Sequence, residues 1–323
     1  MGAAHAKAIL LGEHAVVYGA PAIAIPVDEL VTEVVIEPST GGLWVDSDLY
    51  SGTVASAPSR LLPVTAAIRA SVARTQSLLS AASAPPVARE DADASEDLDV
   101  RVRIRSTIPH ERGLGSSAAV AAAIARAVFD ATGTRMDDDT LFALIQTSER
   151  AAHGNPSGID ARTVTSPVPI RFDQGVVSPI AVGAPLTLAF ADSGTSGSTT
   201  QAVGAVRALR DREPARTEAL LSRLAQIAEG AITDLEVGDR DAIGARMSEA
   251  HGILHRVGVS SERLDALVDA AHAAGSAGAK LTGGGLGGCV IAVADSPAHA
   301  DDLGGALRRA GAQNTWTVEV PAA

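Results

Sequence analysis

A loop of small residues at 109–119 is the part of the sequence best suited to bind phosphate. Its Gly113 and Gly115 let the backbone approach an anion closely, and its Ser116 and Ser117 add hydroxyl groups. Apolar residues recur at helical spacing after the loop, so we expect a helix to begin near Ser116. The first amides of a helix lack partners within it, and its dipole is positive at that end. A polyphosphate is therefore a suitable ligand.

Other interpretations of this loop are open. Ser116 could serve only as a helix N-cap, with the two glycines forming a tight turn and no ligand bound. Residues 113–118 also satisfy a relaxed dinucleotide fingerprint, as do residues 283–288. Both matches are weak, because the first does not directly follow its strand and the second precedes a strand. The sequence has no G-x-x-x-x-G-K-[ST] run, which excludes a P-loop protein.

Three further residue types complete a set suited to phosphoryl transfer, which needs a metal, a cation and a group that accepts a proton. Glu149 with Ser117 suits Mg²⁺, which prefers oxygen ligands. Lys7 suits charge stabilisation, and Asp160, after a Gly-Asn-Pro-Ser-Gly turn, suits the base. Taken singly, Glu149 could be a surface helix residue, Asp160 a helix N-cap and Lys7 a solvated charge on an edge strand.

The elements that must position these residues follow from the apolar pattern. The acidic segment 81–97, with Pro85-Pro86, is interpreted as a solvated insertion. From residue 185 the pattern changes to helices between strands, which indicates a second α+β domain, so the predicted domains are 1–184 and 185–323. Strands are expected at 7–11, 21–27, 31–37, 43–46, 98–105 and 186–191, with two more around the glycine segment 283–288 and one at 315–320. Helices are expected at 61–79, from 116, at 137–153, between 199 and 274, and before 315.

Composition limits the class of protein. The chain of 323 residues has 26 basic and 38 acidic residues, a net charge of -12, which disfavours general binding to nucleic acid or an anionic membrane. Aromatic residues make up 2% of the chain, so platforms for base stacking are nearly absent. The single cysteine, Cys289, excludes an internal disulfide. We expect a cytoplasmic enzyme with a small-molecule substrate and a possible homodimer.

Three segments in order, 7–19, 109–119 and 280–289, resemble the motifs of the GHMP small-molecule kinases. The resemblance implies a two-domain α+β GHMP kinase fold, with a ribosomal-S5-like N-terminal domain and a ferredoxin-like C-terminal domain. It also implies that ATP and Mg²⁺ bind in the cleft between these domains. Within the family, residues 12–17 and 149–160 are similar to the members that phosphorylate mevalonate.

The resemblance assigns roles to individual residues. Asp160 matches the catalytic base and Lys7 its cationic neighbour, while Ser117 and Glu149 match the metal ligands. Glu13, His14 and Thr199 fall where the family contacts or frames mevalonate, together with Asp160, although His14 could be a hydrogen-bonded structural residue and Thr199 a helix cap. The chain departs from the family in Ala-His-Ala before Lys7, which leaves the role of His5 open. The residues matched to ATP binding are Pro109, Arg112, Gly113, Leu114, Gly115, Ser116, Ser117 and Ala118.

Competing functions differ in residues near these motifs. Galactokinases carry polar groups after Gly-Glu-His, whereas Ala15, Val16 and Val17 are apolar here. A phosphomevalonate kinase would need extra cations for its more anionic substrate, and homoserine kinases lack the 155–160 segment. A non-catalytic metabolite sensor would need no base, so Lys7, Glu149 and Asp160 together argue against it.

Overall fold

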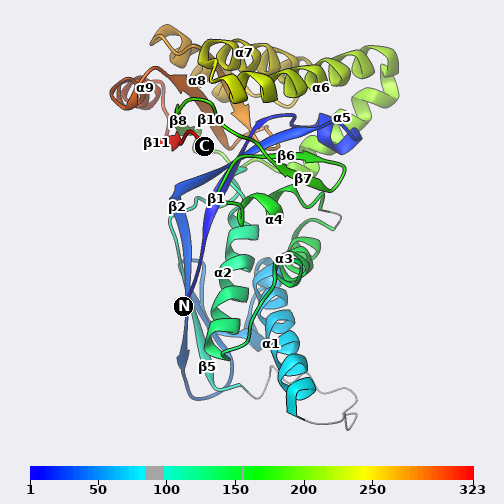
Figure 1. Ribbon diagram of the computed structural model, residues 1–323, viewed down its shortest axis with the longest axis vertical. Helices are drawn as coiled ribbons and strands as arrows, with labels where there is room; N and C mark the ends of the chain where they lie inside the picture. The colour runs from blue at the N-terminus through cyan, green and yellow to red at the C-terminus, as the bar shows by residue number, and fades with distance from the viewer. Residues whose placement is uncertain (84–97, 155) are drawn as a thin grey trace. The chain divides into compact units, whose positions relative to one another are not determined.

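The computed structural model describes residues 1–83, 98–154 and 156–323 (Figure 1). It forms two compact units, each assembled from segments that are distant in the sequence. The first unit comprises residues 1–6, 30–108 and 115–165, and the second comprises residues 7–29, 109–114 and 166–323. The domain boundary at 184/185 stays a prediction.

The first unit pairs strands with three long helices. Residues 32–38 of β2 (Ala22–Pro38) pair antiparallel with β5 (Val100–Ser106), so that Val34 lies opposite Ile104. The parallel neighbour of β5 is β3 (Trp44–Ser47), which forms a hairpin with β4 (Tyr50–Thr53). The helices are α1 (Leu62–Ser83), α2 (Ser116–Ala131), α3 (Asp138–His153) and the short α4 (Ile159–Thr163).

Helix α2 lies between the strands of the first unit and helices α1 and α3 (Figure 1). Its alanine-rich sequence explains this position, because alanine favours the helix and lets neighbours approach closely. Residues 118–125 are all buried, as expected of a helix that is covered all round. The prediction of a helix beginning at Ser116 is confirmed.

The second unit contains an antiparallel sheet in the order β11-β8-β10-β9. Strands β8 (Leu186–Asp192) and β10 (Cys289–Ala294) are buried along their whole length, and β9 (Ala279–Thr282) and β11 (Asn314–Val320) flank them. Helices α8 and α9 pack on this sheet, α7 packs on β9, and α6 packs on α7. The helices are α5 (Thr199–Arg212), α6 (Pro214–Val237), α7 (Arg240–Arg256), α8 (Glu262–Ala273) and α9 (Pro297–Arg309).

Three expectations are changed by the structure. The strands expected at 21–27 and 31–37 are one strand, because Asp28 and Glu29 are exposed on β2 and do not interrupt it. A hairpin of β6 (Ile170–Asp173) and β7 (Val176–Pro179) lies in a part of the chain where no strand was expected. The first three residues of the expected insertion at 81–97 belong to α1, and residues 84–97 lie outside the described residues.

The remaining long elements match their predicted types, including β1 (Gly2–Leu11), whose second half was expected as a strand. Within the described ranges, no helix is long and apolar enough to cross a membrane.

Candidate active site

The predicted phosphate loop leads directly into α2. Gly115 is the N-cap of this helix with a left-handed φ of 70°, and Gly113 has a φ of 77°. The interpretation of Ser116 as the N-cap is wrong, because Ser116 is the first residue of the helix. The amides that open α2 therefore have no acceptor in a preceding turn, as an anion site requires.

Gly113 has a second role that the sequence did not indicate. A Cβ on Gly113 would lie 3.0 Å from the carbonyl oxygen of Thr282 and 3.3 Å from the Cα of Gly283. Only glycine therefore lets this part of the loop pack against the end of β9. The backbone amide of Lys7 donates to the carbonyl of Leu114 at 3.1 Å, so β1 holds the same loop from another side.

Ser117 and Glu149 are in contact in the first unit. The Ser117 hydroxyl, on the first turn of α2, donates to Glu149 Oε1 on α3. Glu149 is only 3% exposed, so its interpretation as a surface helix residue is wrong. His153, one turn further along α3, places Nε2 3.9 Å from Glu149 Oε2. A buried carboxylate touching a hydroxyl provides two hard oxygen donors, which fit Mg²⁺.

These two side chains would not complete the coordination of Mg²⁺ by themselves. Among the described residues there is no group of three or more His, Cys, Asp or Glu side chains that could hold a metal. Mg²⁺ commonly takes one or two carboxylates and completes its six ligands with water and substrate phosphate oxygens. The donor set at Ser117 and Glu149 is of that kind.

Asp160 lies in the first turn of the short helix α4, in the first unit. The N-cap of α4 is Gly158, with a left-handed φ of 92°, so the interpretation of Asp160 as an N-cap is wrong. Gly158 also packs against the ring of Phe142, since an added Cβ would meet ring carbon Cζ at 3.2 Å. Asp160 itself is half-buried, which leaves part of the carboxylate accessible.

Lys7 lies on β1 in the second unit and is 2% exposed. The interpretation of Lys7 as a solvated charge on an edge strand is therefore wrong. A lysine at this depth is strongly desolvated, and burial of a cation has to be balanced by nearby polar or charged groups.

Glu13 and His14 follow β1 in a turn of the second unit. Glu13 is 2% exposed, and its carboxylate accepts from the ammonium of Lys280, which is 0% exposed. Burial raises the pKa of Glu13, and the attraction of Lys280 opposes that rise. Burial likewise lowers the pKa of Lys280, opposed by Glu13. Each group thus depends on the other to stay charged.

His14 is held in an uncommon conformation by a hydrogen bond. Its φ is 62°, and its Nε2 donates to the carbonyl of Gly284 at 2.9 Å. Burial lowers the pKa of His14 to about 4, so the ring is neutral at pH 7. Since Nε2 carries the proton in this tautomer, Nδ1 is left as an acceptor.

Thr199 begins α5 and lies against the same glycine. A Cβ on Gly284 would be 2.9 Å from the Cα of Thr199 and 3.0 Å from its Oγ1. The N-cap of α5 is Ser198, which accepts from the amide of Gln201 at 3.2 Å, so the interpretation of Thr199 as a cap is wrong. Gly284 thus adjoins two of the predicted substrate residues, His14 and Thr199.

Arg112 of the loop is part of an ion pair. Its Nε donates to Asp192 Oδ1 at 2.7 Å, and the same oxygen accepts from the amide of Gly194 at 2.8 Å. The amide of Gly197 donates to the carbonyl of Glu111 at 3.1 Å. Segment 193–199, which leads into α5, is therefore held to the loop by two interactions, one through Asp192 and one at Gly197.

The predicted residues divide between the two units. The first unit contains Gly115, Ser116, Ser117, Ala118, Glu149 and Asp160, and the described structure brings Ser117 and Glu149 together there. The second unit brings His14 and Thr199 to Gly284. The members of the second unit are Lys7, Glu13, His14, Pro109, Arg112, Gly113, Leu114 and Thr199.

Three residues of this arrangement were not predicted: Asp192, Lys280 and Gly284. Lys280 had a signal in the sequence, because it lies between Ala279 and Leu281 in a strand that is otherwise apolar or buried. A lysine in such a strand needs a buried acidic partner. Which acid it pairs with could not be read from the sequence.

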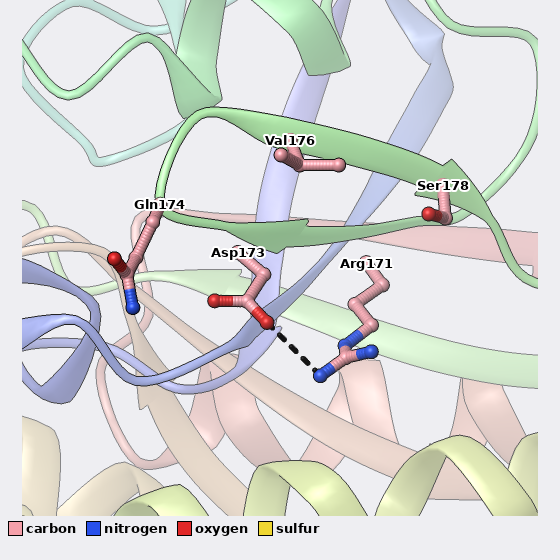
Figure 2. Close-up of a pocket in the computed structure, with 5 residues that line it drawn as sticks. All are labelled: Arg171, Asp173, Gln174, Val176 and Ser178. Atoms are coloured by element: carbon pink, nitrogen blue, oxygen red, sulfur yellow. Dashed lines mark hydrogen bonds and ion pairs between the residues drawn. The ribbon is translucent and has the colours of Figure 1, made fainter.

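A pocket of about 320 Å³ lies at the β6–β7 hairpin. None of the residues that line it is a predicted site residue. Figure 2 shows Arg171 pointing toward Asp173, with Gln174, Val176 and Ser178 around it. Arg171 also pairs with Glu229 at 3.2 Å. Its charge is thus already balanced by two carboxylates, so the pocket lacks the free cation that a phosphate ligand would need.

Comparison with known proteins gives the family. Residues 80–166 match the N-terminal domain of GHMP kinases, and residues 231–313 match the C-terminal domain. A relative from Thermococcus gammatolerans, a mevalonate kinase, is 34% identical over 305 residues, covering 91% of this chain and 89% of the relative. The chain belongs to the GHMP kinase family. The predicted two-domain α+β GHMP kinase fold is thereby confirmed.

Other members of the family agree in length and fold. A mevalonate kinase of Pyrococcus furiosus is 31% identical over 96% of this chain and 93% of the relative. The crystal structure of L. major mevalonate kinase in complex with R-mevalonate has a TM-score of 0.81 and 25% identity, covering 100% of this chain and 96% of that one. The similarity therefore extends over both family domains.

Proposed function

We propose that this protein is an ATP-dependent kinase that phosphorylates the primary hydroxyl of mevalonate to give 5-phosphomevalonate. Its relatives at 31% and 34% identity are mevalonate kinases, and a solved structure of the same fold holds R-mevalonate. The observation in this structure that carries the proposal is the buried Glu149 carboxylate in contact with Ser117 at the start of α2. A metabolite sensor would need no base, so the presence of Asp160 together with Lys7 and Glu149 argues against that alternative.

The phosphates of ATP are assigned to the loop 109–118. The open amides of α2 and its positive dipole end favour the anion, and the Ser116 and Ser117 hydroxyls add donors. Ser117 and Glu149 would hold Mg²⁺, which on binding neutralises charge on the transferred phosphoryl group. This metal site is part of the proposal.

Asp160 and Lys7 are assigned to the transfer itself. Asp160 accepts the proton of the substrate hydroxyl as the oxygen of that hydroxyl forms its bond to the γ-phosphorus. The bond from the γ-phosphorus to the bridging oxygen breaks, and ADP leaves with that oxygen. The buried ammonium of Lys7 offsets the negative charge that is spread over the transferred group.

The substrate is assigned to the side of His14 and Thr199. Neutral His14 uses Nε2 on Gly284, so its Nδ1 can accept a hydrogen bond from a substrate hydroxyl. The exposed Thr199 hydroxyl can donate to a carboxylate. Glu13 belongs to the same turn, but its carboxylate is already paired with Lys280.

Phosphomevalonate is a less suitable substrate for the same residues. An added phosphate needs cations, and both Lys280 and Arg112 are paired with carboxylates, Glu13 and Asp192. The possible homodimer and the cytoplasmic location remain proposals, with no nucleic acid or membrane partner expected.

A coupled assay of ADP release tests the proposal against its competitors. The purified protein is supplied with ATP and Mg²⁺, and with mevalonate, phosphomevalonate, galactose or homoserine in parallel. We expect ADP release with mevalonate at least about 100-fold faster than with the other three, a discrimination typical of sites that hydrogen-bond their substrate. Equal or faster release with phosphomevalonate would support the alternative kinase.

A further inference from the structure

The ion pair between Lys280 and Glu13 is almost completely buried in the second unit. The side chain of Lys280 is 0% exposed and that of Glu13 is 2% exposed. Besides the carboxylate, the Lys280 ammonium donates to the carbonyl of Leu281 at 2.6 Å. The mechanism above uses neither side chain at the transferred phosphoryl group.

The pair joins two segments that adjoin the substrate residues. Glu13 precedes His14 in the turn after β1, and Lys280 lies on β9, four residues before Gly284. His14 then bonds the carbonyl of Gly284 at 2.9 Å. Two adjacent side chains of the turn, Glu13 and His14, are thus both attached to the β9 segment.

The backbone conformation of this turn is unfavourable unless other parts of the protein hold it in place. His14 has a φ of 62° and a ψ of -43°, and Gly12 has a φ of 102°. A non-glycine residue at positive φ persists only where its surroundings hold it in place. The backbone contributes bonds from Ala15 to Glu13 and from Val16 to Gly12, but these lie within the turn and do not fix it to the sheet.

Stability alone does not explain the pair. Removing two charges from water is costly, and well-packed apolar side chains of similar size often stabilise a protein as well as a buried ion pair does. In some proteins a buried charged or polar group instead selects one arrangement, because a conformation that leaves the group unpaired is strongly disfavoured. We therefore expect the Lys280–Glu13 pair to fix the position of the turn that contains His14, and to contribute little to the free energy of unfolding.

We propose that Lys280 is a positioning residue for substrate recognition, which acts by holding Glu13 and thereby fixing His14 in its substrate-facing conformation. The inference rests on the proposed function, because it concerns the mevalonate side of the site. It assigns Glu13 a role through its ion pair and not through direct contact with the substrate.

Two single variants and one double variant separate the two roles of Glu13. Glu13→Gln leaves the Lys280 ammonium buried without its partner, and Lys280→Met does the same to the Glu13 carboxylate. The double variant exchanges the two charges, Glu13→Lys with Lys280→Glu, so that an ion pair can still join positions 13 and 280 while the carboxylate is removed from position 13. If Glu13 touches mevalonate, the double variant stays defective; if it acts through Lys280, the double variant recovers.

The measurement is mevalonate affinity by isothermal titration calorimetry, with kcat and the KM values for mevalonate and ATP from steady-state kinetics. We expect each single change to weaken mevalonate binding at least about tenfold and to alter the KM for ATP less than about twofold, and the double variant to bind within about threefold of wild type. The control applies the same changes to the exposed pair of Arg223 and Glu249, namely Arg223→Met, Glu249→Gln and the exchange of the two charges, and no change in mevalonate affinity is expected.

Two results would overturn the inference: a double variant as weak as Glu13→Gln alone, or Lys280→Met binding mevalonate as wild type does. If the single variants do not fold, the double variant decides by itself, since near-normal affinity supports the inference and a tenfold loss contradicts it. A wild-type protein that neither binds nor phosphorylates mevalonate would reject the proposed function as well, so failure of the inference alone remains recognisable.

Discussion

Asp160 is placed by the two residues that precede it. Gly158 turns the chain with a φ of 92°, and the buried Ile159 anchors the start of α4. The carboxylate is therefore presented from a short, well-packed helix that begins directly before it. This placement suits a general base, whose oxygen must meet one particular proton.

We predict that Asp160→Asn lowers kcat by about 10²- to 10⁴-fold, the usual cost of losing a general base. ATP affinity should change little, because the loop and α2 are untouched. Turnover by the coupled assay and nucleotide binding by calorimetry provide the test. Asp173→Asn, at the β6–β7 hairpin, is the matched control and should keep wild-type turnover. Near-normal turnover of Asp160→Asn would remove this residue from the base role.

Glu149→Gln should raise the Mg²⁺ concentration needed for half-maximal rate, because an amide is a weaker ligand for a hard cation than a carboxylate. Ser117→Ala should shift the Mg²⁺ titration in the same direction. Glu229→Gln, a change at an exposed acid of α6, should leave the titration unchanged. If the titrations of both site variants coincide with that of wild type, the metal site lies elsewhere.

His14 should make the free energy of unfolding depend on pH. The native pKa is about 4 and the ordinary value is 6.5, so between these limits the unfolded chain binds a proton that the native state does not. Stability is therefore fully present above pH 6.5 and decreases as the pH falls toward 4, by at most about 3 kcal/mol from this residue.

The measurement is urea unfolding of wild type and His14→Gln between about pH 4 and pH 7, the range in which the linkage acts. His251, whose pKa is also lowered by burial, titrates in both proteins, so the difference between them isolates His14. A glutamine side chain can keep a hydrogen bond to the Gly284 carbonyl. Parallel stability curves for the two proteins would show that His14 is not buried in the neutral form.

At the scale of elements, the glycine segment 283–288 after β9 packs closely against the start of α5. Gly284→Ala would place a Cβ 2.9 Å from the Cα of Thr199, a distance that forces the start of α5 to move. We expect a loss of about 1–3 kcal/mol in stability and a higher KM for mevalonate. Thermal unfolding and steady-state kinetics measure the two effects.

Gly204→Ala is the control for this change, since Gly204 is in the interior of α5 and nothing lies within 4 Å of an added Cβ. That substitution should stabilise the protein by about 0.5–1 kcal/mol, as expected for alanine in a helix. A Gly284→Ala protein with unaltered stability and KM would contradict the close fit at Thr199.

The sequence predicted elements where a local signal exists. Helix α3 begins as expected because Asp137 caps it, accepting from the amide of Thr140 at 2.7 Å. The β6–β7 hairpin was missed because its turn is Gln174-Gly175, both at positive φ, and Gln is a weaker signal at that position than Asn or Asp.

Contacts between distant segments could not be predicted from the sequence. The motifs of Glu13 and Lys280 were both recognised, but nothing local pairs an acid with a lysine 267 positions away. The same holds for the burial of Lys7 and Glu149, since isolated charged residues are usually exposed. The turn at Gly113 and Gly115 and the helix that begins at Ser116 are local features and were predictable, whereas the ion pairs around them depend on the tertiary fold.

At the scale of the whole molecule, charge supports a small, modestly anionic substrate. The chain has a net charge of -12, and two cations of the second unit, Lys280 and Arg112, are already paired with carboxylates. A second anionic group on the substrate would meet little positive charge that is not already used. The proposed function therefore requires mevalonate, and not its phosphate, as the acceptor.

Phosphorus-31 NMR of the reaction products tests this requirement most directly. The protein is incubated with ATP, Mg²⁺ and either mevalonate or phosphomevalonate, and the new phosphorus signals are followed over time. We predict that a phosphomonoester is formed from mevalonate together with ADP, and that little phosphomevalonate is converted. No phosphomonoester from mevalonate, or faster formation of a diphosphate from phosphomevalonate, would contradict the proposed function.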